Sequence, residues 1–253
     1  MPRYRREISE LGIYHVMQRG VGKQIIFEDK QDHRFYLDRL KEYRTFANCD
    51  ILAYCIMDNH AHILVKSESL NNISEMMRKL GTSYANYYNQ KYEHSGHVFQ
   101  GRFLSEAVND ESYLFACVRY IHNNPVKAGI TSRDRYPWSS YREYIEGSIL
   151  INTGILLPLI GDVQNFESFS AQADDIMVLD FEGYGLTEAD AISIINRELE
   201  TECSSANIVK TLNKPERDRI LVILKDLGMS VRTIERITGV NKNIIYRAGK
   251  SFS

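Results

Sequence analysis

The order of strand-like and helix-like segments along the first half of the chain, read from the spacing of apolar residues, limits the fold more than any other feature. Four segments have the composition or alternation of β-strands: residues 12–19, 51–57, 61–65 and 103–108. Three segments repeat apolar residues at helical spacing: residues 29–48, 72–90 and 110–124, the last of which we expect to stop at Pro125 and Gly129. The order strand, helix, strand, strand, helix, strand, helix predicts an α+β domain with a ferredoxin-like split βαβ arrangement and an antiparallel sheet.

The C-terminal part has a different organisation, which predicts an all-α region. Three short helices are expected at residues 215–227, 231–238 and 242–250, separated by Gly228 and Gly239. Ser230 and Asn241 occupy positions that favour N-caps, and a glycine-containing turn before the last helix is typical of a helix-turn-helix. We therefore expect a domain at 1–150, an acidic helical connector at 151–210 and a helix-turn-helix region at 211–253.

Charge is unevenly distributed over these three parts, although the net charge of the 253 residues is only -2. Residues 1–150 carry 20 Lys and Arg against 18 Asp and Glu, residues 151–210 carry 2 against 11, and residues 211–253 carry 9 against 4. The basic C-terminal block permits contact with phosphates, and it equally suits a solvated helical surface. Without a long apolar run, a signal-like N-terminus or a Cys-x-x-Cys pair, the sequence predicts a soluble cytoplasmic protein with reduced cysteines and no membrane partner.

The segment His60-Ala61-His62 is the first candidate for chemistry. Residues i and i+2 of a strand project from the same face, so both imidazoles could bind one metal ion. Two ligands are too few for a tight metal site, so a third ligand is expected elsewhere. Taken alone, the pair is more commonly two surface or core histidines.

The segment from Tyr120 to Pro125 is the second candidate. On a helix, Tyr120 and Asn124 share a face one turn apart, so the Asn124 side chain could supply a third, oxygen ligand. A tyrosine can act as a covalent nucleophile when a metal or a base favours its phenolate. The chain has 16 tyrosines, however, and most buried tyrosines only pack. Because Pro125 disfavours the α conformation of the residue before it, distortion of the last turn is expected.

Cationic side chains near these segments are candidates for DNA phosphate contact: Arg19, Arg78, Lys79, Arg102, Arg119 and Lys127. The last predicted helix has two sides. Its exposed side would carry Lys242, Asn243 and Arg247, and its inward side would carry Val240, Ile244 and Ile245. That pattern suits a helix that reads the major groove of duplex DNA, and it also suits a three-helix bundle used for packing or dimerisation.

Five blocks between about residues 8 and 145 resemble the HUH-type single-strand transposases, specifically the REP-associated tyrosine transposases. The blocks begin with Tyr14-His15-Val16 followed by Arg19-Gly20, and continue with residues 57–64, 96–103, 120–129 and 136–141. The resemblance implies a Mg or Mn site formed by His60, His62 and Asn124. It also implies that Tyr120 attacks a DNA phosphate, releasing a 3′ hydroxyl and forming a 5′-phosphotyrosine that a second DNA end can later reverse.

The implied substrate is structured or palindromic single-stranded DNA, such as a hairpin, with duplex DNA bound through the C-terminal region. Tyr113, one heptad before Tyr120, is a rival nucleophile that lies outside the matching block. Two alternatives stay open: a noncatalytic DNA-binding regulator that keeps the fold, and a metal-dependent phosphodiesterase that uses water. The sequence also leaves open whether Tyr120 acts in its own subunit or in the site of a homodimer partner.

Overall fold

The computed structural model describes residues 7–173, 176, 178, 188–226, 229 and 231–248. Contacts between Cα atoms divide the chain into a first unit, Met1–Val178, and a second unit, Leu179–Ser253. This division differs from the boundaries expected at residues 150 and 210. The acidic segment 151–210 is shared between the units, because its first helices pack on the first unit and its later helix packs in the second.

The first unit is built on a four-stranded antiparallel sheet with the order β2-β3-β1-β4. Its leading elements are β1 (Ile13–Arg19), the 3-10 turn η1 (Val21–Lys23), α1 (Lys30–Phe46), β2 (Asp50–Met57), β3 (His60–Lys66), α2 (Leu70–Lys91), β4 (Leu104–Val108) and α3 (Glu111–Lys127). Strands β1 and β2 both pair with β3 between them, which is the split βαβ arrangement. The α+β class and the ferredoxin-like order predicted from the sequence are confirmed.

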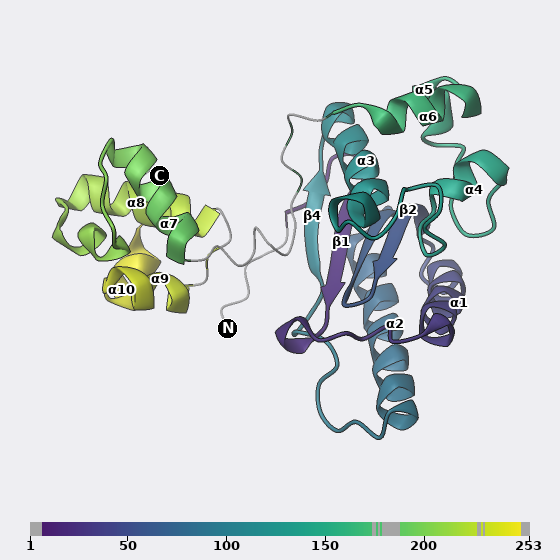
Figure 1. Ribbon diagram of the computed structural model, residues 1–253, viewed down its shortest axis with the longest axis horizontal. Helices are drawn as coiled ribbons and strands as arrows, with labels where there is room; N and C mark the ends of the chain where they lie inside the picture. The colour runs from purple at the N-terminus through teal and green to yellow at the C-terminus, as the bar shows by residue number, and fades with distance from the viewer. Residues whose placement is uncertain are drawn as a thin grey trace. The chain divides into compact units, whose positions relative to one another are not determined.

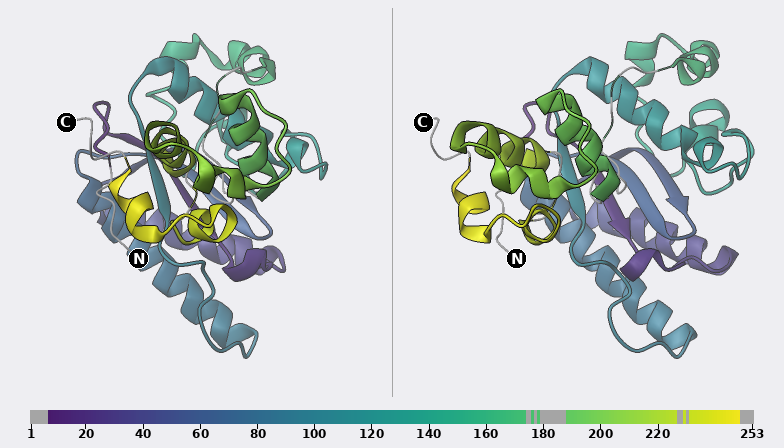
Figure 2. Two further views of the ribbon diagram at one scale, coloured as in Figure 1. Left: turned by 90° about the vertical axis from the view of Figure 1, so that its left-hand side faces the viewer. Right: turned by 60° about the vertical axis from the view of Figure 1, so that its left-hand side comes forward.

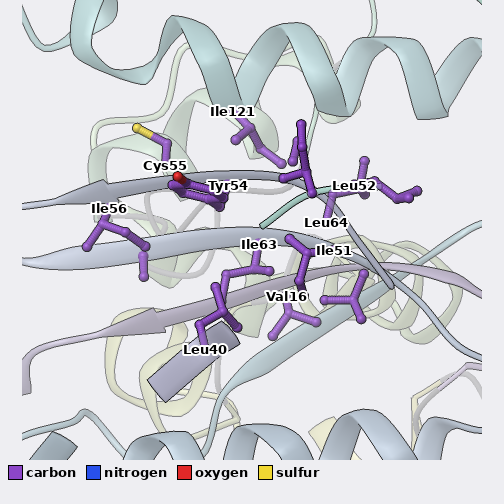
Figure 3. Packing of buried hydrophobic residues seen from close by; sticks show 14 of the residues in the cluster. Val16, Leu40, Ile51, Leu52, Tyr54, Cys55, Ile56, Ile63, Leu64 and Ile121 are labelled. Atoms are coloured by element: carbon purple, nitrogen blue, oxygen red, sulfur yellow. The ribbon is translucent and has the colours of Figure 1, made fainter. Parts of the chain in front are cut away.

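The sheet is covered on both faces, as Figures 1 and 2 show: α1 and α2 lie on one side and α3 lies on the other. Figure 3 follows the same layering at side-chain level, with Ile121 of α3 reaching the sheet near Cys55 and Leu40 of α1 reaching it near Val16. Both layers are apolar and fully buried at these positions. Burial of both faces holds the strands in one register, because a slip of one residue would turn every side chain to the wrong face.

Helix α3 begins where the sequence predicts and ends later. The Asp110 side chain accepts a hydrogen bond from the Tyr113 amide at 2.8 Å and caps the helix. The stop expected at Pro125 is wrong, because α3 continues through Pro125 to Lys127. The proline lacks only its own amide donor, whereas the Ala128 amide still donates to the Asn124 carbonyl at 3.0 Å. The last turn therefore stays helical.

Helix α6 (Val163–Ala171) packs on α3, and α4 (Tyr141–Glu146) and α5 (Leu157–Ile160) pack on α6. His122 of α3 is fully buried among them, with its Nε2 2.8 Å from the Ser140 hydroxyl and its ring beside Phe166 and Tyr144. Burial, together with the charge of Arg133, lowers the pKa of His122 to about 3. This imidazole is therefore neutral in the folded protein at physiological pH.

We expect the first unit to lose stability as the pH falls below about 6.5. The unfolded chain takes up a proton on His122 near its ordinary pKa of 6.5, whereas the folded chain does not until about pH 3. Unfolding therefore binds a proton in this window, and the free energy of unfolding should fall by up to about 1.4 kcal/mol per pH unit for this residue.

Urea unfolding followed by fluorescence of Trp138, the single tryptophan of the chain, measures this dependence for the first unit. A His122→Phe variant should be less stable at about pH 7 and should show a shallower pH dependence. An equally steep dependence in the variant would place the proton uptake on other groups, of which the buried histidines His62 and His33 are candidates because burial lowers the pKa of each.

The second unit is helical within its described residues. Its elements are α7 (Glu188–Leu199), the 3-10 segment η3 (Ala206–Thr211), α8 (Lys214–Asp226), α9 (Val231–Thr238) and α10 (Lys242–Arg247). The Asn241 side chain accepts from the Asn243 amide at 2.9 Å, so the predicted N-cap of the last helix is confirmed. Gly239 has a φ of 66°, which suits glycine in the turn between α9 and α10. The expected separator Gly228 and N-cap Ser230 lie outside the described residues.

Candidate functional site

Three histidines share the sheet face that α3 covers. His60 and His62 alternate along β3, and His62 stands opposite Cys55 of β2 and Met17 of β1. His15 of β1 stands opposite Leu64, so it is a diagonal neighbour of His62 on the same face. The same-face placement of His60 and His62 predicted from the sequence follows directly from this register.

The ring contacts of these histidines are specific. The Nε2 atom of His15 lies 3.0 Å from Nδ1 of His62, and the two rings stack with centroids 5.2 Å apart. The Nδ1 atom of His60 lies 2.6 Å from the side-chain oxygen of Asn59, and its ring stands edge-on to His62 at 4.9 Å. For both residues of the pair, Nδ1 is thus used inside the chain, and Nε2 is the ring nitrogen suited to a metal ligand.

Tyr120 reaches this cluster from α3. Its ring centroid is 5.5 Å from that of His62 and 6.1 Å from that of His15, both edge-on. Asn124, one helical turn later, donates through Nδ2 to the Tyr120 carbonyl at 3.0 Å. This bond orients the amide so that Oδ1 is its remaining acceptor. The fold therefore brings the Tyr120 ring beside His62, although 58 positions separate the two residues in the sequence, and it bonds Asn124 to the Tyr120 backbone.

Burial sets the protonation of the histidine cluster. His62 is fully buried, and burial lowers its pKa well below the ordinary value; the nearby charges of His60, His15 and Lys127 act in the same direction. A neutral imidazole is the form that binds a metal ion. Tyr120 is 9% exposed as a whole, and its hydroxyl oxygen is buried.

The two histidines would need an amide oxygen as a third ligand to hold a divalent metal ion. Within the part of the chain that the structure describes, no three side chains of His, Cys, Asp or Glu come together in a way that could hold a metal. The His60 and His62 nitrogens with the Asn124 Oδ1 atom would make a mixed nitrogen and oxygen ligand set. Three protein ligands would leave coordination positions for water or a phosphate oxygen, as catalytic sites require.

Tyr113 has a different environment from Tyr120 on the same helix. Its hydroxyl donates a short hydrogen bond to the carboxylate of Glu106 on β4. A carboxylate acceptor stabilises the protonated phenol and opposes formation of a phenolate. Tyr113 therefore serves better as a structural hydrogen bond between α3 and β4 than as a nucleophile.

Three of the expected phosphate-binding cations lie near the cluster or on the loop beside it. Arg19 stands opposite His60 in the β1–β3 register, and its guanidinium donates to the Gln100 side chain at 3.1 Å. Lys127 places its ammonium 4.2 Å from the centre of the Tyr120 ring. Arg102 is exposed, two residues after Gln100.

The other three are placed differently. Arg78 and Lys79 lie on α2, which covers the opposite face of the sheet, where Arg78 pairs with Glu75 at 3.9 Å. Arg119 is only 8% exposed, and its guanidinium packs over the Phe169 ring at 4.7 Å. The expectation of a phosphate contact for Arg119 is therefore replaced by a packing role, because its charged group is turned into the α3–α6 contact.

His15 is the residue of the cluster that sequence reasoning missed. It lies inside a recognised sequence block, yet no spacing rule connects residue 15 with residue 62. The sequence signal is its position in the strand at 12–19. There His15 is the polar residue between Ile13 and Met17, two buried apolar residues on the same face of the strand. Only the β1–β3 pairing shows which histidine it faces.

Comparison with known proteins indicates the class of protein. Residues 9–124 match the family described as "Transposase IS200 like", a match that covers a little under half of the chain. This match and the similarity to a tyrosine transposase support a DNA-processing enzyme. Transposases of this family generally use a divalent metal ion.

Two individual proteins illustrate the similarity. A Haemophilus influenzae protein described as a REP-associated tyrosine transposase is 26% identical over 168 residues, which cover 59% of this chain and 90% of the relative. A solved structure of a REP-associated tyrosine transposase bound to a REP hairpin gives a TM-score of 0.48 with 19% identity, covering 58% of this chain and 86% of the other. Within the described residues, no helix is both long and apolar enough to cross a membrane.

Proposed function

We propose that this chain is a metal-dependent endonuclease and strand transferase for single-stranded DNA, with Tyr120 as its covalent nucleophile. The observation that carries the proposal is the placement of the Tyr120 ring 5.5 Å from the ring of buried His62. His60, His62 and Asn124 would hold the metal ion, whose charge would favour the phenolate of Tyr120. The substrate class is structured or palindromic DNA such as hairpins, in keeping with the similarity to a REP-associated transposase, and the site of action is the cytoplasm.

The proposed reaction exchanges one phosphate ester for another. The Tyr120 hydroxyl gives up its proton and its oxygen forms a bond to phosphorus as the bond from phosphorus to the 3′ oxygen breaks. The departing 3′ oxygen takes up a proton and becomes the 3′ hydroxyl. The DNA 5′ end is left on the protein as a phosphotyrosine, so attack by a second 3′ hydroxyl can reverse the step and join two strands. The bound Mg or Mn ion would polarise the phosphate and stabilise the developing negative charge.

The residues of the chain prepare this step in distinct ways. Burial keeps His62 neutral for ligation, and the bond between Asn124 and the Tyr120 carbonyl holds the third ligand one turn from the nucleophile. Lys127, over the Tyr120 ring, places a positive charge beside a forming phenolate. Because Tyr120 lies beside the histidines of its own chain, we propose that it acts within its own subunit, including in a homodimer.

One experiment tests this proposal as a whole. Full-length protein is incubated with a library of hairpin DNAs labelled on the 3′ side of the cut and with Mn, and the products are separated on a denaturing gel. We expect cleaved DNA together with a denaturant-resistant protein–DNA band. Cleavage without any such band would favour a water nucleophile, and binding without cleavage would favour a regulator.

Among the cations, Arg19 and Lys127 should contribute to DNA affinity whereas Arg78 should not. Arg19→Ala should weaken binding to a single-stranded target and reduce the slope of log K against log salt by about 0.7 if one phosphate contact is lost. Arg78→Ala removes an equally charged side chain from the opposite face of the molecule and serves as the matched control. Fluorescence anisotropy at several salt concentrations measures both effects, and equal slopes for the two variants would contradict the assignment.

We propose that the second unit binds duplex DNA through α10. Lys242, Asn243 and Arg247 are exposed. On the inward side Val240 and Ile245 are buried and Ile244 is partly buried against the same core, which supports a groove-reading helix. The Gly239 turn and the Asn241 cap place α10 directly after α9, as in a helix-turn-helix.

Replacing Lys242 and Arg247 by alanine should weaken binding to duplex-flanked hairpins and reduce the salt slope by about 1.8, corresponding to two duplex phosphates. Cleavage of short single strands should be unchanged. Arg197→Ala on α7, where the arginine is 70% exposed, is the matched control. Unchanged duplex binding in the double variant would assign the second unit to packing or dimerisation.

A further inference from the structure

The contact between His15 and His62 must have a defined donor, and the identity of that donor decides which nitrogen of His62 can bind a metal. A neutral imidazole carries one proton, so in the 3.0 Å contact one ring donates and the other accepts. If His15 Nε2 donated, His62 would keep its own proton on Nε2 and present no lone pair there. If His62 Nδ1 donates, Nε2 of His62 carries the lone pair.

The neighbouring histidine provides an internal reference for this choice. The Asn59 amide nitrogen donates to the Lys23 carbonyl at 3.2 Å, so the Asn59 side-chain oxygen is the atom that faces His60. An oxygen can only accept, and the His60 Nδ1 atom is therefore the donor in the 2.6 Å contact. In its neutral form, His60 consequently presents its lone pair at Nε2.

We propose that His15 is a positioning residue that accepts a hydrogen bond from Nδ1 of His62 and so keeps the Nε2 lone pair of His62 available as a metal ligand. With this assignment both histidines of the pair have the same tautomer, one held by Asn59 and the other by His15. Ring stacking at 5.2 Å and complete burial of both His15 and His62 fix the orientation as well as the tautomer. The inference rests on the metal site of the proposed function.

Loss of the acceptor should weaken the site without removing a ligand. In His15→Phe the aromatic volume is retained, but the His62 proton is no longer held on Nδ1 and the Nε2–H tautomer, which cannot bind a metal, becomes populated. Loss of such an outer partner typically costs about 10-fold to 100-fold in metal affinity. In His15→Gln a side-chain oxygen can again accept near the position of the lost nitrogen, so affinity should return most of the way to that of the wild type.

The matched control is His33→Phe. His33 is also a buried histidine, but it belongs to α1 on the opposite side of the sheet, where it stacks on Trp138 at 4.6 Å. This variant loses a buried imidazole without touching the proposed site. Its metal affinity should therefore equal that of the wild type, whatever its effect on stability.

Two readouts test the proposal on the full-length protein without DNA. Long-range proton–nitrogen NMR of the imidazoles reports tautomers, and we expect His62 as the Nδ1–H form in the wild type and in His15→Gln, with Nε2–H appearing in His15→Phe. Titration of free Mn2+ by EPR measures affinity in the same set.

The outcomes separate the two proposals. Mn2+ binding that is equally tight in His15→Phe, with His62 in an unchanged tautomer, would overturn the role of His15 and leave the metal site standing. Finding His62 as the Nε2–H form in the wild type would also overturn it. A wild-type protein that binds no Mn2+ would overturn the metal site itself and the role of His15 with it.

Discussion

Tyr120→Phe should abolish strand cleavage and protein–DNA adduct formation while leaving the fold and DNA affinity nearly unchanged. The substitution removes only the oxygen that would bond to phosphorus, and it keeps the ring that contacts His15, His62 and Lys127. Loss of a covalent nucleophile typically reduces turnover by at least about a thousandfold. The denaturing gel with 3′-side-labelled hairpin DNA and Mn measures the result directly.

Tyr113→Phe is the matched control for this experiment. It removes a tyrosine hydroxyl from the same helix, one that donates to Glu106. The adduct should persist in this variant, with a modest loss of stability because a hydrogen bond to a charged group is removed, worth roughly 1.5–3 kcal/mol. An adduct that survives in Tyr120→Phe and disappears only when Tyr113 is changed as well would transfer the nucleophile to Tyr113.

His60→Ala should remove metal binding and adduct formation together. We expect the Mn2+ affinity to fall by more than about 100-fold, because loss of a direct ligand costs more than loss of an outer-shell partner. His60 is half-buried, so this variant separates ligand loss from core disruption better than His62→Ala does. His62 is fully buried, so replacing it by alanine also removes side-chain volume from the core.

His62→Ala should therefore lose the same activity and also lose stability. Cys55→Ala is the control for the packing effect, since Cys55 stands directly opposite His62 in the β2–β3 register and is equally buried. Cys55→Ala should retain Mn2+ binding and adduct formation. Normal cleavage by His60→Ala and His62→Ala across a metal titration would remove the metal site from the mechanism.

Much of the first unit could be predicted because local patterns and tertiary packing agree there. The segment 61–65 is an apolar run, as expected for a strand covered on both faces, and the observed β3 runs from His60 to Lys66. Capping side chains such as Asp110 act within three residues of themselves, so helix starts are readable from sequence. Helix ends are harder to predict, since α3 continues past Pro125 to Lys127 while the Ala128 amide still donates to the Asn124 carbonyl.

The division into units and the roles of single cations could not be predicted in the same way. Arg119 has the sequence context of a phosphate-binding residue, but its direction is set by Phe169, fifty residues later. The segment 151–210 is uniformly acidic, yet its first part packs on α3 and its last part packs in the second unit. Composition does not show whether a helix of this segment packs on the first unit or in the second unit.

The sequence by itself determined the strand and helix order, the same-face spacing of His60 and His62, and the one-turn spacing of Tyr120 and Asn124, because each depends on a period of two or of 3.6 residues. Tertiary structure alone decided that these two pairs meet, that His15 contacts His62, and that Tyr113 contacts Glu106. The physical reason is strand pairing. Register between β1 and β3 and the docking of α3 arise from burial summed over the whole sheet, which no local spacing contains.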